Sequence, residues 1–161
     1  MELIKRKQNR LTDYDYAQNG AYFITICVND RKPILSSITV GADIIRPNNI
    51  KLTNIGKVVD YSINSILLHY DGVFVDNYVI MPNHIHMIIR IENDGGRMVS
   101  APTIVAGMKR YVSTKIGKSI WQKSFYDHII RDDYDYQTKW QYIDENPGKW
   151  LEDELYTSDI I

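Results

Sequence analysis

Short runs of β-branched and aromatic residues alternate along this chain with longer segments whose apolar residues recur at spacings of three and four. The first pattern is typical of β-strands and the second of amphipathic helices. The predicted strands are 21–28, 73–80, 84–91 and 124–131, and a run at 34–40 is a candidate hairpin partner of the first. The predicted helices run from 53 to about 69, from 100 to 116 and from 132 to about 146.

Capping residues mark the ends of the predicted helices. The N-cap candidates are Thr53, Ser100, and Asp132 or Asp133. Gly117 suits the position after the second helix, where a left-handed backbone is common. Pro147 disfavours helical backbone at Asn146, so the last helix should stop there. Residues 41–50, rich in Gly, Pro and Asn, read as loop.

The order of elements defines a fold class. Strand, helix, strand, strand, helix, strand is the ferredoxin-like βαββαβ plan, and this chain adds a C-terminal helix. The expected α+β fold has a central antiparallel sheet with two helices on one face, and the other face is free for a ligand or the last helix. The length of 161 residues fits a single domain. Residues 1–18 are expected to form a basic N-terminal arm, and residues 150–161 a peripheral acidic tail.

Composition narrows the class of protein. The chain is 44% hydrophobic and 24% charged, which is ordinary for a soluble globular domain. Cys27 is the only cysteine, which excludes an intrachain disulfide and fits a reducing, cytoplasmic compartment. No window approaches the roughly 20 apolar residues of a membrane span, and no signal-peptide pattern follows the basic first ten residues.

Charge is unevenly distributed although the net charge is only -1. Residues 97–126 contain six basic residues and no acid, whereas residues 127–161 contain ten acids and three basic residues. A chain polarised in this way can offer a local phosphate-binding surface while staying near neutral. A solvated helix face is the alternative interpretation of the basic run.

Two histidines in the apolar run 78–90 carry the most specific chemical signal. His84 and His86 are two residues apart on a predicted strand, so their imidazoles share one face while Ile85 and Met87 point to the other. Two neutral imidazoles so placed can form half of a metal site. The alternative is a pair of hydrogen-bonded core residues, although burying two imidazoles without partners is costly.

The surrounding sequence, Met81-Pro82-Asn83-His84-Ile85-His86-Met87-Ile88-Ile89, resembles the His-hydrophobic-His motif of the HUH endonucleases. In particular it is similar to the single-tyrosine transposases associated with repetitive extragenic palindromes (REP), and the resemblance covers roughly residues 10 to 150. The segment from Tyr142 to Pro147 resembles the nucleophile helix of this family. There a polar residue four positions after the tyrosine completes the metal site; some members have Gln, and this chain has Asn146.

The resemblance implies a metal-dependent enzyme that nicks and joins single-stranded DNA beside a hairpin through a 5′-phosphotyrosine. It implies Tyr142 as the nucleophile, with His84, His86 and Asn146 as ligands of Mg²⁺ or Mn²⁺. The spacing agrees, because Tyr142 and Asn146 lie one turn apart on one helix face. The expected phosphate contacts are Arg6, Lys7, Lys109, Arg110, Lys115, Lys118 and Lys123. Relatives include monomers acting in cis and dimers that exchange the tyrosine helix, so a homodimer stays open.

Two other hypotheses compete with this one. A non-catalytic DNA-hairpin-binding protein derived from the same fold would have lost the chemistry, yet all four candidate site residues are present. A small zinc hydrolase would need a carboxylate general base near the histidines, and the nearest in sequence, Asp76, is eight residues away. Among the 12 tyrosines, Tyr126 is the competitor of Tyr142, but its segment reads as a core strand.

Overall fold

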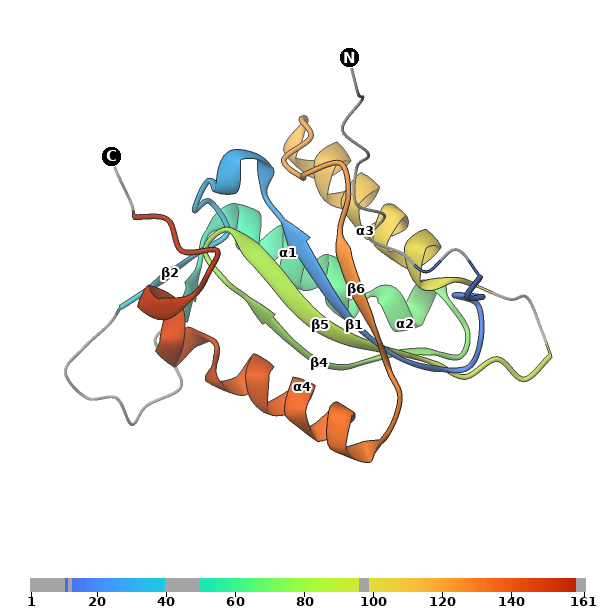
Figure 1. Ribbon diagram of the computed structural model, residues 1–161. Helices are drawn as coiled ribbons and strands as arrows, with labels where there is room; N and C mark the ends of the chain where they lie inside the picture. The colour runs from blue at the N-terminus through green and yellow to red at the C-terminus, as the bar shows by residue number, and fades with distance from the viewer. Residues whose placement is uncertain (1–10, 12, 40–49, 96–98, 159–161) are drawn as a thin grey trace, which may run out of the picture.

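The computed structural model describes residues 11, 13–39, 50–95 and 99–158 (Figure 1). Its strands are β1 (Gly20–Cys27), β2 (Ser36–Ile38), β3 (Ile50–Leu52), β4 (Val73–Ile80), β5 (His84–Ile91) and β6 (Tyr126–Ile130). Its helices are α1 (Asn54–Asn64), α2 (Ile66–His69), α3 (Ala101–Ile116) and α4 (Asp133–Glu145), with 3-10 turns η1 (Asn29–Arg31) and η2 (Pro147–Glu152). None of the helices in the described ranges is long and apolar enough to cross a membrane.

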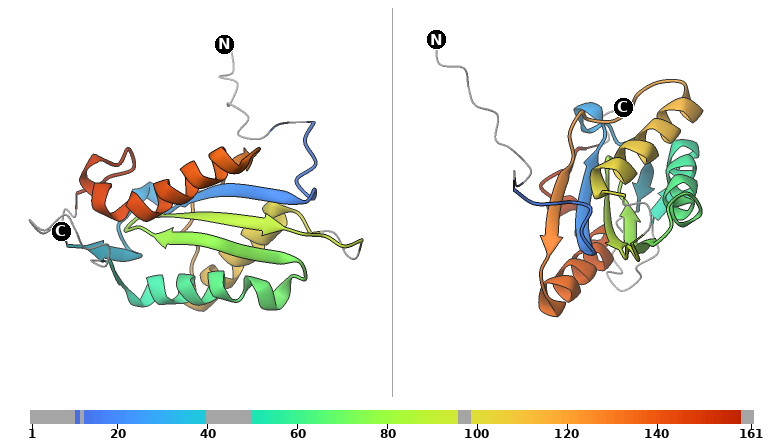
Figure 2. Two further views of the ribbon diagram at one scale, coloured as in Figure 1. Left: turned by 90° about the horizontal axis from the view of Figure 1, so that it is seen from below. Right: turned by 90° about the vertical axis from the view of Figure 1, so that its right-hand side faces the viewer.

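Four strands form the central sheet in the order β4-β5-β1-β6, with every neighbouring pair antiparallel. This order, with the first and third strands of the βαββαβ unit in the middle, confirms the predicted ferredoxin-like α+β fold. Helices α1 and α3 lie on one face of the sheet and α4 lies on the other (Figure 2). The last helix therefore occupies the face that the βαββαβ plan leaves free.

The face toward α1 and α3 holds the larger apolar core. Alternate residues of the central strands point into it because successive strand side chains face opposite ways. From β1 and β5 these are Tyr22, Ile24, Ile26, Ile85, Met87, Ile89 and Ile91. The predicted stripe of α3, Val105, Met108 and Val112, packs against them. The N-caps Thr53, Ser100 and Asp132 are confirmed, each accepting a backbone N–H.

The face toward α4 holds a smaller buried cluster. It consists of Phe23, Val79, Met81, Ile88, Ile143 and Trp150. His84 and His86 lie on this face because they alternate with Ile85 and Met87 along β5. The two buried histidines therefore lie under α4, at the end of β5 where the chain enters from the turn at Pro82 and Asn83.

Three local predictions were wrong. The run 34–40 does not pair with β1, because β5 and β6 already occupy both sides of that strand. It contains β2, which pairs with β3. The first helix is interrupted at Ser65, which divides it into α1 and α2. The last helix does end before Pro147, but Asn146 keeps helical backbone angles and leads directly into η2.

The segment after α4 is also not peripheral in the part that the structure describes. Trp150 is buried in the cluster under α4, and its ring meets that of Tyr156. The side chain of Asn83 donates a hydrogen bond to the carbonyl of Leu155 at 2.7 Å. These contacts return residues 150–157 to the end of the sheet where the histidines lie.

Candidate metal and tyrosine site

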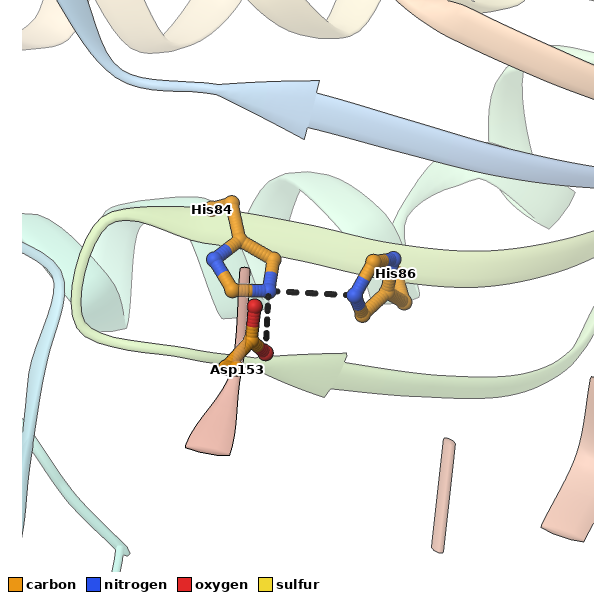
Figure 3. Close-up of side chains that lie close together, drawn as sticks. All are labelled: His84, His86 and Asp153. Atoms are coloured by element: carbon orange, nitrogen blue, oxygen red, sulfur yellow. Dashed lines mark hydrogen bonds and ion pairs between the residues drawn. The ribbon is translucent and has the colours of Figure 1, made fainter. Parts of the chain in front are cut away.

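His84 and His86 point to the same place from one face of β5 (Figure 3). Their Nε2 atoms are 3.0 Å apart, and their rings meet edge to face with centroids 4.5 Å apart. Both side chains are buried. The sequence prediction that the two imidazoles share a face is thus confirmed, and they converge at their Nε2 atoms.

Hydrogen bonds at the other ring nitrogens fix the orientation of the pair. The Asn83 amide nitrogen faces two carbonyl oxygens, of Arg31 and Leu155, so its Oδ1 must be the atom 2.7 Å from His84 Nδ1. His84 Nδ1–H therefore donates to Asn83, and His84 Nε2 carries a free lone pair. On the neighbouring strand, Thr25 lies opposite His86, and its hydroxyl is 2.8 Å from His86 Nδ1.

Burial keeps both imidazoles neutral. It lowers the pKa of His84 to about 4, against opposing contributions from the Asp153 carboxylate and the Asn146 amide. Burial also lowers the pKa of His86 well below its ordinary value, with further lowering by His84 and by the charge of Lys139. At neutral pH the pair therefore presents unprotonated nitrogen, the form that binds metal ions.

Two oxygen atoms complete a convergent set of lone pairs. Asp153 from the tail places Oδ2 at 3.6 Å from His84 Nε2, and the ligand atoms of His84, His86 and Asp153 lie within 4.8 Å of one another (Figure 3). Asn146 is only 5% exposed. Its Oδ1 and the Asp153 Oδ2 are both buried without a hydrogen-bond partner among the described residues.

This donor set fits a divalent cation. A neutral imidazole nitrogen facing a carboxylate oxygen, with no hydrogen between them, is unfavourable unless a positive charge lies nearby. Two ligands held at right angles by an ion at about 2.1 Å are about 3 Å apart, close to the separation of the two Nε2 atoms. A mixed set of imidazole, carboxylate and amide oxygen suits Mn²⁺, which accepts both nitrogen and oxygen ligands.

The Tyr142 ring packs against the His86 ring of the histidine pair. Its ring centroid is 5.1 Å from that of His86, with an interplanar angle of 68°, and 5.8 Å from that of Phe23. The side chain is 47% exposed, so a substrate can reach the phenol. The structure thus brings the predicted nucleophile to the predicted metal ligands within one chain. Tyr126 is half exposed on β6, at the far edge of the sheet from β4.

The environment holds the Tyr142 phenol in its protonated form. Burial raises the pKa of Tyr142, the acids Asp153 and Glu154 raise it further, and the Asn146 amide opposes them. Asn146 therefore influences the pKa of both Tyr142 and His84. The phenol needs a positive charge nearby before it can act as a phenolate at neutral pH.

Polar contacts fix α4, and hence Tyr142, on the sheet. A β-bulge on β4 makes Asp76 an extra residue, so that Asp76 and Asn77 both reach α4. The Tyr136 hydroxyl donates to Asp76 at 2.8 Å, and the Asn77 amide donates to Asp144 at 3.0 Å. At the start of the helix, His128 Nε2 lies 2.7 Å from the Asp135 carboxylate. His128 is therefore a partly exposed partner of α4.

The predicted DNA-binding residues that the structure describes fall into two groups, one across the sheet from this site and one near it. Arg6 and Lys7 fall outside the described residues. Lys109, Arg110 and Lys115 are on α3, across the sheet from α4, and Lys109 donates a hydrogen bond to the carbonyl of Gln122 at 2.8 Å. Lys118 and Lys123 are exposed in the segment that pairs beside the end of β1, near His84.

Sequence reasoning missed Asp153, Asn83 and Thr25. Asp153 comes from a segment with no helical or strand periodicity, and Thr25 meets His86 only through strand pairing. The one local signal was the presence of Trp150 and Tyr156 in an otherwise acidic tail, since aromatic residues there indicate packing.

Comparisons with known proteins agree with the fold and the motifs. No family model matches the chain. An uncharacterised protein of Haemophilus influenzae is 30% identical, covering 94% of this chain and 93% of that protein. A second Haemophilus influenzae protein, assigned as a REP-associated tyrosine transposase, is 26% identical, covering 84% of this chain and 74% of its own length.

Solved structures show the same fold. A REP-associated tyrosine transposase bound to a REP hairpin superposes with a TM-score of 0.63 at 23% identity, over 86% of this chain and 74% of that one. A protein of Deinococcus radiodurans assigned as a transposase has a TM-score of 0.50 at 14% identity, over 87% and 97%. With its histidine pair and facing tyrosine, the molecule has the fold of a tyrosine transposase. The chain is similar in sequence to a REP-associated tyrosine transposase and shares the fold of another.

Proposed function

We propose that this protein is a metal-dependent transposase-type endonuclease and strand transferase that cuts single-stranded DNA beside a hairpin through a 5′-phosphotyrosine. The observation that carries the proposal is the position of Tyr142, whose ring lies 5.1 Å from that of His86, where the ligand atoms of His84, His86 and Asp153 converge. A half-exposed tyrosine at a buried metal site is what this chemistry requires.

The reaction assigns a task to each residue. The phenol oxygen of Tyr142 attacks the phosphorus, the bond to the 3′ oxygen breaks, and a 5′-phosphotyrosine remains on the protein. The phenol gives up its proton and the leaving oxygen takes one up, which yields a 3′-OH. The tyrosyl ester keeps the energy of the broken bond, so a 3′-OH can attack it later and rejoin strands.

His84, His86 and Asn146, with Asp153 added by the structure, would hold the divalent ion, Mn²⁺ or Mg²⁺. Bound there, the ion supplies positive charge for a non-bridging phosphate oxygen and for the charge that develops in the transition state. Asn83 holds His84 in the tautomer whose Nε2 is unprotonated, and the Thr25 hydroxyl, which can accept from His86 Nδ1–H, would orient His86 for the ion.

The proposed DNA partner rests on the comparison with a solved structure. The solved relative is bound to a REP hairpin, and we propose that this chain also recognises a palindromic hairpin with a single-stranded flank. The exposed cations Lys118 and Lys123 lie at the same end of the sheet as His84 and are the better placed of the predicted phosphate contacts.

The test is incubation with hairpin oligonucleotides, built from the palindromes that flank the gene, in Mn²⁺. A covalent protein–DNA band on a denaturing gel is the expected result, absent with chelator and absent in Tyr142→Phe. Tyr134→Phe is the matched control, because Tyr134 is on the same helix and 83% exposed. Adduct formation by Tyr142→Phe would reject the nucleophile assignment. DNA binding by the wild-type protein without any adduct would favour the non-catalytic hairpin-binding protein.

One observation also favours the hydrolase hypothesis. The structure supplies the carboxylate that the sequence lacked, because Asp153 Oδ2 is 3.6 Å from His84 Nε2. A hydrolase would use water and leave a free 5′-phosphate with no protein adduct. The covalent band therefore separates the two activities directly.

A further inference from the structure

Lys139 places a positive charge beside the nucleophile. Lys139, Tyr142 and Asn146 follow one another on α4 at spacings of three and four, so they share one helix face. The Lys139 Nζ lies over the ring of Phe23, 5.0 Å from its centroid. Its charge also acts on His86, where it contributes to the lowered pKa of that imidazole.

Phe23 connects Lys139 with the reacting groups. This buried ring stacks on His86, with centroids 5.3 Å apart and planes 22° apart, and it meets Tyr142 edge-on at 5.8 Å. The amine, the imidazole and the phenol thus surround a single ring. This shared contact puts the Lys139 amine in the neighbourhood of the reacting groups.

The Lys139 amine is available for an anion. No carboxylate forms an ion pair with it among the residues that the structure describes, although Asp135, one turn earlier, senses its charge. The Asp135 carboxylate is already bound to His128 at 2.7 Å. By contrast, Lys149 on the other side of Tyr142 pairs with Glu145.

The opposite side of Tyr142 repels phosphate. A cleft of about 210 Å³ opens there, beside Asn146. Its charged lining consists of Glu145, Lys149, Glu152, Asp153 and Glu154, with four acids against one amine. A polyanionic strand entering by this cleft would meet like charges.

We infer that Lys139 binds the phosphate that Tyr142 attacks, and that the DNA strand reaches the site along the amino-terminal half of α4 and not through the acidic cleft. This inference rests on the proposed function. In this role the Lys139 amine holds a non-bridging oxygen from the side opposite Asp153, and it favours the phenolate that Tyr142 becomes during attack.

The experiment compares Lys139→Met with Lys139→Arg and Lys149→Met. Methionine keeps the aliphatic stem on Phe23 and removes the charge, arginine keeps the charge, and Lys149→Met removes a charge from the acidic cleft. Single-turnover adduct formation with Mn²⁺ and saturating hairpin DNA is expected to slow by roughly tenfold or more in Lys139→Met. Lys139→Arg should recover most of the rate, and Lys149→Met should match the wild type.

The salt dependence of DNA binding distinguishes a phosphate contact from a purely structural role of Lys139, because only a phosphate contact changes it. In the Tyr142→Phe background, Lys139→Met should reduce the slope of log K against log salt by about 0.7, the value for one single-strand phosphate contact. Replacing the scissile phosphate with a neutral methylphosphonate should abolish that difference. Lys139→Gln repeats the test if the methionine variant melts at a lower temperature than the wild type.

The outcomes separate this inference from the function on which it rests. Adduct formation at the wild-type rate in Lys139→Met, with an unchanged salt slope, overturns the role of Lys139 and leaves Tyr142 as nucleophile. A wild-type protein that forms no adduct with any hairpin overturns both proposals together.

Discussion

The two faces of the central sheet are built differently. The face toward α1 and α3 is closed by a continuous apolar core that takes alternate residues from β1 and β5. The face toward α4 has a cluster of six buried apolar residues. Hydrogen bonds from α4 to β4 and β6 also hold this helix on the sheet. One face therefore carries most of the hydrophobic stabilisation, and the other tolerates the buried polar groups of the site.

Because of this difference, substitutions that affect stability and substitutions that affect the site should fall on different faces of the sheet. Changes on the α1/α3 face should unfold the protein without touching the metal ligands. Changes on the α4 face should alter metal binding or reaction rate with a smaller loss of stability. The following substitutions test that separation from the largest expected effect to the smallest.

Ile104→Ala on α3 should produce the largest loss of stability. Ile104 is fully buried in the larger core, and such truncations cost about 2–5 kcal/mol. Ile143→Ala on α4, equally buried, should cost about 2 kcal/mol or less, because the smaller cluster beside solvent can relax around the cavity. Urea denaturation of the metal-free proteins measures both. An equal or larger loss for Ile143→Ala would show that the α4 face is as strongly packed as the other.

Asp153→Asn should mainly affect the metal. The substitution keeps the shape of a side chain that is only 4% exposed and removes its charge. We expect roughly 10- to 100-fold weaker Mn²⁺ binding by calorimetry, with a small change in the stability of the metal-free protein. Glu152→Gln, an exposed acid of the same segment, is the control and should bind Mn²⁺ like the wild type. Unchanged affinity in Asp153→Asn would remove Asp153 from the site.

Tyr136→Phe should have the smallest effect on stability. It removes the hydrogen bond to Asp76, whose carboxylate keeps Arg90 as a partner, so the loss should be about 0.5–1.5 kcal/mol. Because this bond fixes the helix that carries Tyr142, the rate of adduct formation should fall several-fold while Mn²⁺ affinity stays unchanged. Tyr134→Phe is the matched control. A rate equal to that of the wild type would show that the β4 contacts do not position the nucleophile.

The sequence was informative wherever short-range pattern decides structure. The alternation in β5 placed His84 and His86 on one face. The resemblance to the HUH transposases implied Tyr142 and Asn146, and their helical spacing agreed with it, so half of the site could be proposed without coordinates. The ferredoxin-like plan then followed from the order of elements. What failed depended on tertiary contacts. Nothing local indicates that the segment after Pro147 turns back so that Asp153 meets His84.

Charge was the weakest guide. The basic run between 97 and 126 indicated a phosphate-binding surface, yet its α3 residues lie across the sheet from Tyr142, and Lys109 is engaged with Gln122. Lys139 lies in a segment rich in acids and was overlooked for that reason. The proposed role of Lys139 rests on the packing of Phe23 against Lys139, His86 and Tyr142.

The most direct test of the account is to locate the covalent bond. The protein is incubated with hairpin DNA and Mn²⁺, digested with protease and nuclease, and the peptide that carries the nucleotide is sequenced by mass spectrometry. We predict a 5′-phosphate ester on Tyr142 alone among the 12 tyrosines, together with a free 3′-OH on the released strand. Attachment to another tyrosine, or cleavage that leaves a free 5′-phosphate and no nucleotide on the protein, would contradict the account.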